Sequence, residues 1–594
     1  MEQEVITQRV EALRSWMRVL GISAFIIPST DPHASEYVPM HWASREWISG
    51  FNGSAGTAVV TLHDAALWTD SRYFLAAAEQ LQHTPFQLMK ERVEGTPNIA
   101  QWLCIKLQSG NIVGVDGRVN TICDINNLRE LLQTKGIHLN LCSDPMEQLW
   151  NTRPSLPKDP IAIQPLKFAG EAFSSKLQRL KQKLLVHGAD SMIISALDEI
   201  AWFLNLRGSD VHCNPVFVSY CLVSPDKVTL YVDRDKINND ISTYLKNNHV
   251  NLQVYEALES DLQHLYNCHI LLTPQTNALI TEAAAQNNTV IFVSSPVAEM
   301  KAIKNSTEIE GFRHAMLRDG VALVKFLRRL DSAVKAGGLT EIGVDRMLTD
   351  FRAEAPLFKD ISFDTIAGYA DHGAIVHYEA TPKTDYELQP HGFLLLDSGA
   401  QYQDGTTDIT RTISLGEPSA EEKHIYTLVL KGHISLSRLK FPRGASGTQL
   451  DLSARYAMWQ EGYNFGHGTG HGVGSYLNVH EGPHQIRMNW MPAPILEGMT
   501  VTDEPGLYLT GRFGVRTENV LLAVPYKKTE FGDFLAFEPL TLCPIDTKPI
   551  DLRMLSSEET TWLNNYHSNV CKKLLPLLDN CEDRDWLCEA TKPI

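Results

Sequence analysis

The sequence predicts two related α/β domains followed by a third domain of the α+β class. Its 594 residues are enough for about four domains of average size. An amphipathic helix followed by a short apolar strand occurs near the beginning of the chain and again near residue 175. Beyond residue 306, helices alternate with strands arranged as hairpins, which is typical of α+β domains.

The first two domains open on the same plan. Residues 8–30 predict an amphipathic helix and a buried strand at 24–28. Residues 175–196 repeat this plan, with a leucine stripe on the helix and the strand at 191–194. We therefore expect two copies of one α/β unit, each alternating helix and strand.

Further similarities support a duplication. Gly21 and Gly188 each stand between helix and strand, where a glycine commonly ends a helix. Segment 47–54 also resembles segment 202–209. The alternative is chance similarity between two ordinary α/β openings.

Proline-rich and helix-capping signals predict the domain boundaries. The stretch 154–165 holds four prolines and is the expected linker between the first two domains. Thr307 and Glu310 form a T-x-x-E capping box that starts the first helix of the third domain. Ser556 and Glu559 start the last long helix in the same way. The predicted domains are 1–155, 156–300 and 301–594.

Composition excludes several classes of function. The 53 basic and 70 acidic residues give a net charge of −17, which repels nucleic acid, and no basic patch offsets it. No apolar stretch is long enough to span a membrane, and the N-terminus is too polar for a signal peptide. The ten cysteines lack any CxxC pair, which favours reduced thiols in the cytoplasm.

Two acidic residues lie on a predicted hairpin of the third domain. A buried strand at 393–396 runs into Asp397, and after a turn at 401–405 the returning strand carries Asp408. The two aspartates are symmetric about the turn, so we expect cross-strand partners with Cβ atoms about 5 Å apart. Two buried like charges repel, so either one takes a proton or a cation lies between them.

A second hairpin repeats this arrangement. Glu504 and Glu518 are centred on Gly511 and are expected to face each other. A single acidic pair would more often be a solvated turn. Two pairs, each beside apolar strands, instead favour a buried acidic site.

Between the hairpins, glycine occupies every second position of 466–474, which excludes a helix. In an extended chain His467 and His471 lie on one face, about 13 Å apart. One ion cannot bind both unless the chain folds back, so we expect one metal ligand and one outer or substrate contact. The glycines allow another backbone to approach closely.

Four carboxylates and one imidazole form a hard, oxygen-rich ligand set. Such a set favours Mn²⁺ or a similar octahedral ion over a thiolate-type zinc site. Two ions are needed to balance four carboxylates, and paired metal ions are typical of hydrolases such as aminopeptidases. The residues alone therefore predict metal-assisted hydrolysis, without a substrate.

The ligand set and its neighbouring segments resemble one known family. The order Asp397, Asp408, His471, Glu504, Glu518 is similar to the ligand set of pita-bread metallopeptidases. Five segments resemble the aminopeptidase P (Xaa-Pro aminopeptidase) family in its three-domain, cytosolic-type form: 47–57, 68–74, 373–378, 466–474 and 477–483. The resemblance implies two creatinase/prolidase N-terminal-like α/β domains and a C-terminal pita-bread catalytic domain with a helical extension.

The resemblance also implies a role for each ligand. Asp397 chelates one Mn²⁺, Asp408 and Glu518 bridge both ions, and His471 and Glu504 hold the other. Glu504 is also the general base, acting on a hydroxide that bridges the two ions. Co²⁺ and Zn²⁺ remain alternatives to Mn²⁺.

Outside the ligands, the resemblance assigns substrate contacts to His377, His467 and His480, which stabilise the reaction intermediate. The alternative for each is a structural imidazole. Arg516 is implied as a supporting residue near the cluster. Three further histidines match nothing in the family and are expected to be surface or core residues: His372, His424 and His433.

The implied reaction is hydrolysis of the first peptide bond in peptides with proline at the second position, by a homodimer. Segment 47–54 either helps to close the active site or is core packing. A prolidase-like dipeptidase is the nearest alternative, but prolidases lack the second α/β domain. A catalytically inactive binding module and a metal-free hydrolase of creatinase type fit the sequence less well, because all five ligands are present.

Overall fold

The computed structural model describes residues 2–594 and divides into two compact units. The first unit consists of residues 1–163 and 172–297, and the second of residues 164–171 and 298–594. Within residues 2–594, no helix combines the length and apolar character that crossing a bilayer requires.

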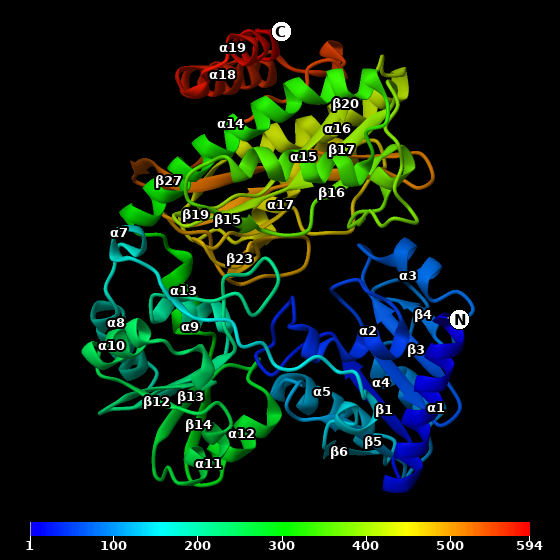
Figure 1. Cartoon of the computed structure of the whole chain (residues 1–594), viewed down its shortest axis with the longest axis vertical. Coiled ribbons are helices and arrows are strands. Elements are labelled where there is room, and N and C mark those ends of the chain that lie inside the picture. Colours follow the sequence, from blue (N-terminus) through cyan, green and yellow to red (C-terminus); the bar gives the residue numbers. More distant parts are fainter. Residues whose placement is uncertain (1) are drawn as a thin grey trace. The chain divides into compact units, whose positions relative to one another are not determined.

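Two six-stranded sheets form the centre of the first unit (Figure 1). The strands of the first sheet are β1 (Ala24–Pro28), β2 (Thr57–Thr61), β3 (Ala65–Thr69), β4 (Gln87–Lys90), β5 (Ile112–Asp116) and β6 (His138–Cys142). Those of the second are β8 (Ser191–Ile194), β10 (Ser219–Val223), β11 (Val228–Val232), β12 (Val250–Gln253), β13 (His269–Leu272) and β14 (Thr289–Phe292).

The two sheets share one topology. Their strand orders are β4-β3-β2-β1-β5-β6 and β12-β11-β10-β8-β13-β14. In each sheet the first strand in the chain is antiparallel to the second and parallel to the fifth. Each of the remaining strand pairs also runs in the same relative direction in the two sheets. Identical order and direction in all six strands support duplication rather than chance similarity.

Helices pack around both sheets of the first unit. They are α1 (Glu2–Leu20), α2 (Ser44–Ser49), α3 (Phe74–Gln80), α4 (Ile99–Lys106), α5 (Ile122–Gln133), α6 (Met146–Leu149), α8 (Phe173–Val186), α9 (Leu197–Phe203), α10 (Asn239–Asn247), α11 (Ala257–Gln263) and α12 (Ala278–Ala285), with short 3-10 turns η1 (Met40–Trp42) and η2 (Arg234–Lys236).

The predicted helix–strand openings at 8–30 and 175–196 are confirmed by α1–β1 and α8–β8. Gly21 and Gly188 end the two helices with the same left-handed φ of 68°. A two-stranded ladder joins β7 (Ala162–Ile163) to β9 (Leu206–Arg207).

The second unit contains five small sheets. Its strands are β15 (Phe358–Ile361), β16 (Ile366–Tyr369), β17 (Phe393–Ser398), β18 (Ala400–Tyr402), β19 (Gly405–Thr406), β20 (Ile409–Ser414), β21 (Lys440–Pro442), β22 (Gly470–Gly472), β23 (Glu481–Ile486), β24 (Thr500–Asp503), β25 (Gly506–Leu509), β26 (Phe513–Arg516), β27 (Asn519–Thr529) and β28 (Gly532–Pro539). The sheets are β15-β18-β19, β16-β17-β20, β21-β28-β27-β24, β22-β23 and β25-β26. The predicted α+β character of this part of the chain is confirmed.

The helices of the second unit are α7 (Leu166–Ala169), α14 (Ser306–Ala336), α15 (Glu341–Ala353), α16 (Ala420–Ser437), α17 (Gly447–Trp459), α18 (Ser557–Leu574) and α19 (Cys581–Ala590), with η3 (Ala370–Ala374), η4 (Leu552–Met554) and η5 (Leu575–Leu577). Helix α13 (Pro296–Ala302) spans the point where the second unit begins. In Figure 1, α14 and α15 run beside the strands of this unit.

One predicted cap is wrong and another is right. The N-cap of α14 is Asn305, two residues before the predicted Thr307: Asn305 accepts hydrogen bonds from two backbone N–H groups, and Glu308 completes the capping box. Asparagine is at least as good an N-cap as threonine. The capping box of Ser556 and Glu559 at α18 is confirmed.

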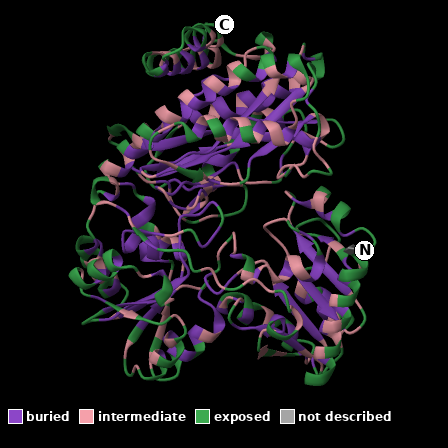
Figure 2. Ribbon diagram, in the orientation of Figure 1, coloured by how far each residue is buried: buried purple, intermediate pink, exposed green. Residues whose placement is uncertain are grey.

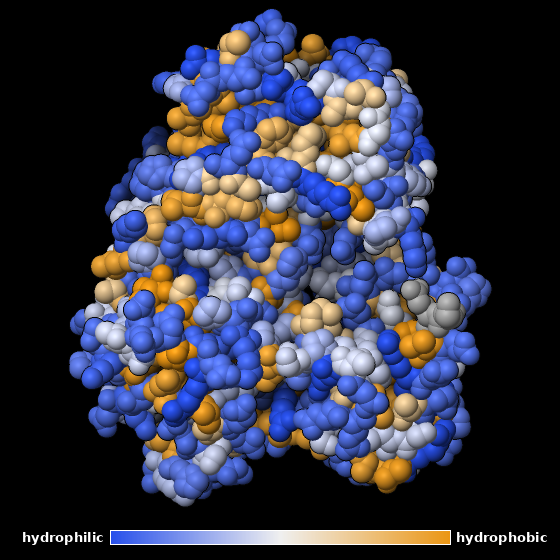
Figure 3. All heavy atoms as spheres, in the orientation of Figure 1, coloured by the Kyte–Doolittle hydropathy of each residue, from blue (hydrophilic) through white to orange (hydrophobic). Residues whose placement is uncertain are grey.

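The strands are buried and the helices are amphipathic. Figure 2 shows buried residues along the strands and exposed residues on one side of most helices. In the second unit, one apolar cluster joins α16, α18 and β26 through residues such as Val429, Val570 and Val515, each fully buried. On the face drawn in Figure 3, hydrophobic residues form small groups among hydrophilic ones.

Candidate metal centre

The first acidic hairpin places Asp397 at the end of β17 and Asp408 directly before β20. Its register differs from the prediction. Asp397 pairs with Thr410, and the same register continues through Gln401 and Thr406. Asp408 is therefore a diagonal neighbour of Asp397 rather than its direct partner, because the turn is centred one residue later than the symmetric placement assumed.

The second hairpin has the predicted register. Asp503 pairs with Asn519 between β24 and β27, and Gly506 pairs with Arg516 between β25 and β26. Glu504 and Glu518 lie at the gap between these two ladders. The same register on both sides sets them opposite each other, as predicted.

The glycine-rich segment is extended at β22 and brings His471 to the acidic residues. A Cβ on Gly470 would lie 1.9 Å from the carbonyl oxygen of Thr502, and one on Gly472 would lie 2.5 Å from that of Glu481. Only glycine permits these approaches. The predicted close backbone approach is thus confirmed, and it positions the imidazole between the two hairpins.

The acidic residues and His471 come together. Nε2 of His471 lies 3.5 Å from Oδ2 of Asp408 and 3.5 Å from Oε1 of Glu504. Within residues 2–594, Asp408, His471 and Glu518 offer ligand atoms that all lie within 4.8 Å of one another. Ligand atoms this close to one another can coordinate a single cation.

Burial and mutual repulsion shift the acid–base properties of the cluster. Burial, followed by the negative charge of Asp397, raises the pKa of Asp408 well above its usual value. Burial and the charge of Asp408 do the same to the pKa of Glu518. Burial raises the pKa of Glu504 to about 7, although Arg516 opposes the shift. Without a cation, Glu504 therefore binds a proton near neutral pH, and Asp408 and Glu518 hold protons more tightly than ordinary carboxylates do.

Asp397 offers a free oxygen to the cluster. Its Oδ2 accepts a hydrogen bond from Nη2 of Arg516 at 2.7 Å. Its Oδ1 is buried and, among the described residues, has no hydrogen-bond partner. A buried carboxylate oxygen without a partner is costly, and a divalent cation would satisfy it. The residues present therefore fit a hard metal ion.

Tyr508 is a site residue that the sequence reasoning missed. Its hydroxyl accepts a hydrogen bond from Nη1 of Arg516 at 2.7 Å and lies 2.8 Å from Nε2 of His467. Nδ1 of His467 faces the carbonyl oxygen of Gly468 at 2.6 Å, so this nitrogen carries the proton and Nε2 accepts from Tyr508. Strand alternation was the available signal, because Tyr508 lies four residues beyond Glu504 in the same hairpin.

The other two predicted substrate histidines, His480 and His377, lie near the cluster beside different residues. The ring of His480 is 4.3 Å from that of His471, edge to face. His377 follows Val376, whose carbonyl oxygen lies 3.4 Å from Nη2 of Arg516. Both histidines are half-buried. These positions are compatible with contact to a substrate.

Of the three unassigned histidines, His372 and His433 are buried and His424 pairs with Glu461 at the surface, as expected for core and surface residues. The ring of His372 stacks on Tyr378 and Tyr386. Its Nδ1 lies 2.9 Å from Oε1 of the buried Glu341. This stack anchors the loop that contains His377.

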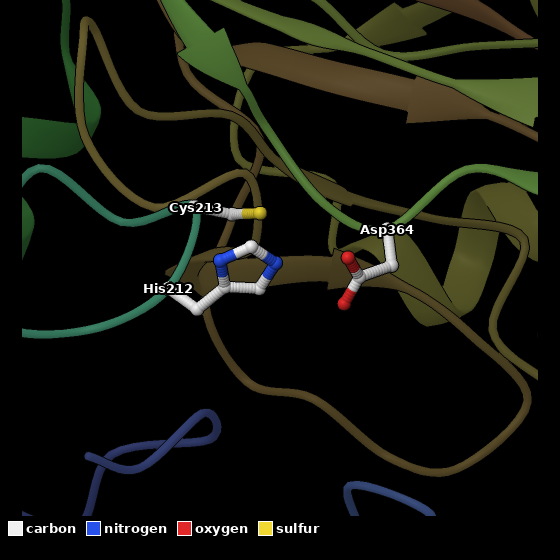
Figure 4. Close-up of side chains that lie close together, drawn as sticks. All are labelled: His212, Cys213 and Asp364. Atoms are coloured by element: carbon white, nitrogen blue, oxygen red, sulfur yellow. The ribbon is translucent and has the colours of Figure 1, made fainter. Parts of the chain in front are cut away.

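A second set of possible ligand types is shown in Figure 4. His212 and Cys213 are consecutive on a loop of the first unit, whereas Asp364 belongs to the second unit. Because the three residues do not belong to one unit, we assign no metal site to them.

Four segments of the chain match known families. Residues 9–149 and 152–308 each match the creatinase/prolidase N-terminal domain. Residues 310–525 match metallopeptidase family M24, and residues 533–594 match the C-terminal region of peptidase M24. The two N-terminal matches agree with the repeated sheet topology of the first unit.

Relatives match the chain over nearly its whole length. It is 39% identical to "Xaa-Pro aminopeptidase 1" of Dictyostelium discoideum, over 100% of this chain and 97% of the relative. It is 41% identical to "Aminopeptidase P2" of Arabidopsis thaliana, over 97% and 86%.

Solved structures differ in how much of the chain they match. A cytosolic X-prolyl aminopeptidase of Caenorhabditis elegans, described as having a di-nuclear active site, aligns with a TM-score of 0.96 and 34% identity over 99% of this chain and 100% of that one. An Xaa-Pro dipeptidase of Bacillus anthracis aligns with a TM-score of 0.52 and 25% identity, over 63% of this chain and 99% of that one.

Proposed function

The chain belongs to the Xaa-Pro aminopeptidase family of M24 metallopeptidases, and on this premise we propose that its second unit removes the first residue from peptides with proline at the second position. The observation that carries the proposal is the meeting of four carboxylates and His471 in one largely buried cluster. Burial of the carboxylates and the unpartnered oxygen of Asp397 support bound cations there.

Two divalent ions, Mn²⁺ in preference to Co²⁺ or Zn²⁺, are proposed as the cofactors. Five residues hold them: Asp397, Asp408, His471, Glu504 and Glu518. The oxygen-rich donor set supports a hard ion, and the di-nuclear site of the similar worm enzyme supports the number. When bound, the ions supply Lewis-acid polarisation of the scissile carbonyl and acidify water.

Glu504 is the proposed general base. Its pKa of about 7 in the absence of cations reflects burial and neighbouring negative charge, and Arg516 opposes the shift. Bound cations lower that pKa and keep the carboxylate ready to accept a proton. Its side chain is 18% exposed, so a substrate can reach it.

His377, His467 and His480 are proposed to bind the substrate backbone and to stabilise charge on the reacting carbonyl. The hydrogen bonds from Arg516 to Tyr508 and from Tyr508 to His467 support a fixed orientation for the last imidazole. Proline in the second position lacks an N–H, so a site that binds it must not require a donor at that position.

A prolidase-like dipeptidase fits less well. The Bacillus anthracis dipeptidase aligns with 63% of this chain, whereas the worm aminopeptidase aligns with 99%. The duplicated α/β domain is the difference that favours the aminopeptidase. An inactive binding module would have no reason to keep the complete ligand set.

The proposal is tested by cleavage of an Arg-Pro-Pro tripeptide. The protein is stripped with a chelator, supplied with Mn²⁺ and compared with an Asp408→Ala variant. Release of arginine by the wild-type protein alone supports the proposal. No release of arginine despite bound Mn²⁺ would contradict the proposed substrate.

A homodimer is proposed, with α17 at its interface. Leu452, Tyr456 and Trp459 lie on one face of this helix and are 50%, 58% and 39% exposed. Trp490, 70% exposed, lies on a neighbouring loop that Thr448 of α17 holds through the carbonyl of Asn489 at 2.9 Å. Such an apolar group favours a second copy of the chain. Sedimentation of a Leu452→Asp variant tests this: a monomer is expected, and an unchanged dimer would exclude α17.

We further propose a cytoplasmic location and domains bounded near residues 155 and 300. All ten cysteines are free thiols, which suits a reducing compartment, and the similar worm enzyme is described as cytosolic. The family matches 9–149, 152–308 and 310–525 support the boundaries.

A further inference from the structure

Two buried polar residues flank the glutamates of the candidate metal centre. Asp503 precedes Glu504, and Asn519 follows Glu518. Asp503 and Asn519 are paired across β24 and β27, and both side chains are fully buried. Because neighbouring side chains on a strand point to opposite faces, these two point away from the face that carries the glutamates. Whatever fixes Asp503 and Asn519 also fixes the backbone that carries the glutamates.

His433 on α16 contacts both flanking residues. Its Nδ1 lies 3.1 Å from the carbonyl oxygen of Asp503 and 3.3 Å from Oδ2 of the same residue. Its Nε2 lies 3.2 Å from Nδ2 of Asn519. The imidazole is itself fully buried. One ring therefore joins the two strands directly behind the glutamates.

The surrounding hydrogen bonds assign the proton of this imidazole. Oδ1 of Asn519 accepts from Nη2 of Arg411 at 2.9 Å and from the hydroxyl of Tyr566 at 3.3 Å. The other end of the amide must then donate, so Nε2 of His433 is an acceptor. The proton is on Nδ1 and is donated to Asp503. His433 is thus a neutral connector with a defined donor end and acceptor end.

The same layer holds the two strands at further points. Nη1 of Arg411 donates to the carbonyl oxygen of Glu518 at 2.6 Å. The hydroxyl of Ser437, one helical turn beyond His433 on α16, donates to Oδ2 of Asp503 at 2.7 Å. Tyr566 brings α18 into this layer.

We propose that His433 is a positioning residue for the metal centre, an inference that rests on the proposed function. Through Asp503 and Asn519 it holds Glu504 and Glu518 at the separation that two divalent ions require. It touches neither the substrate nor the ions. Residues behind metal ligands commonly alter affinity or activity by about 10–100-fold when they are changed.

Three substitutions of His433 remove its hydrogen bonds to Asp503 and Asn519 to different extents. His433→Phe keeps the ring but loses both bonds. His433→Asn is shorter, so it retains the bond to Asp503 and does not reach Asn519. His433→Gln has a side-chain amide whose NH2 can donate to Asp503 and whose oxygen can accept from Asn519. A matched control is His33→Phe in the first unit, where a buried imidazole also bonds at both nitrogens, to Ser195 and Tyr255.

The measurements are Mn²⁺ binding to the chelator-stripped full chain by calorimetry, and kcat and KM for Arg-Pro-Pro at saturating Mn²⁺. We expect His433→Phe to weaken Mn²⁺ binding and to lower kcat by about tenfold or more. KM should change little, because His433 does not contact the substrate. His433→Gln should recover most of both losses, His433→Asn should be intermediate, and His33→Phe should bind Mn²⁺ like the wild-type protein.

Wild-type Mn²⁺ affinity and kcat in both His433→Phe and His433→Asn would overturn the inference, as would equal losses in the Gln and Asn variants. Should the Phe variant not fold, the comparison of Gln with Asn decides the question. A wild-type chain that binds Mn²⁺ but leaves the tripeptide intact would contradict the proposed function, and the Mn²⁺ affinities alone would then decide the inference.

Discussion

Arg516 donates a hydrogen bond from Nη2 to Oδ2 of Asp397 at 2.7 Å, with both side chains buried. This bond occupies one carboxylate oxygen and turns the other, which has no partner among the described residues, toward the acidic cluster. The guanidinium also bonds Tyr508 and Thr410. Arg516 thus fixes Asp397 and partly offsets the negative charge of its neighbours.

Replacing Arg516 with lysine should impair catalysis more than folding. A single ammonium group cannot reproduce the planar fork that reaches Asp397 and Tyr508 together. We expect kcat/KM for Arg-Pro-Pro to fall by about 10–100-fold with Mn²⁺ still bound. Steady-state kinetics with metal analysis measure this, and wild-type kcat/KM would contradict the role given to Arg516.

Replacing Tyr508 with phenylalanine should lower activity without loss of metal. The change removes the hydroxyl that bonds both Arg516 and His467, so each of these side chains loses one hydrogen bond. A lost hydrogen bond of this kind costs about 1–3 kcal/mol, or about five- to 150-fold in kcat/KM. Calorimetry should still find wild-type Mn²⁺ affinity; a weakened affinity would place Tyr508 in the metal centre instead.

Glu504 should make the chelator-stripped protein less stable as pH rises, in the opposite direction to the effect of His484 described below. The pKa of Glu504 is raised from 4.5 to about 7 in the folded chain, so its stabilising contribution is present below pH 4.5 and lost as pH rises through 7. Between pH 5 and 8 this amounts to about 2 kcal/mol.

Denaturation in chelator at both pH values checks this expectation. A Glu504→Gln variant should show a smaller decline, because the amide does not titrate. Equal declines in the variant and the wild-type protein would show that Glu504 is not the group responsible.

His484 should make the protein sensitive to acid. Burial lowers the pKa of this histidine from 6.5 to about 4, and its Nε2 donates to the carbonyl oxygen of Thr500 at 2.7 Å. An unfolded histidine binds a proton more readily, so stability is lost as pH falls from 6.5 toward 4, by about 2 kcal/mol at pH 5. His484→Gln keeps a donor but does not titrate. It should lose less stability than the wild-type protein between pH 7 and 5, and an equal loss would contradict this.

Most of the fold, and the meeting of the acidic residues with His471, could be predicted from the sequence. Periodic patterns located both helix–strand openings, and the repeated topology agrees with a duplication. The facing of Glu504 and Glu518 followed from symmetry about Gly511. Symmetry failed for Asp397 and Asp408, because turn geometry rather than residue counting sets register and a shift of one residue in the turn centre changes every pair.

Other features could not be predicted because they depend on contacts between distant segments. Asn305 rather than Thr307 caps α14, a choice between two competent caps that local sequence does not decide. Tyr508 bonds Arg516, 8 positions away in the sequence, and His433 bonds Asn519, 86 positions away. No spacing in the sequence identifies such partners, and only the packing of α16 behind β24 and β27 shows that His433 belongs to the site.

The most direct test is the number of Mn²⁺ ions per chain at which the chelator-stripped protein reaches full activity on Arg-Pro-Pro. The account predicts that release of arginine rises with added Mn²⁺ and saturates at two ions per chain, with no activity in Asp408→Ala. Full activity without a divalent ion, or a chain that binds no Mn²⁺, would contradict the assignment of Asp397, Asp408, His471, Glu504 and Glu518 as a two-metal site.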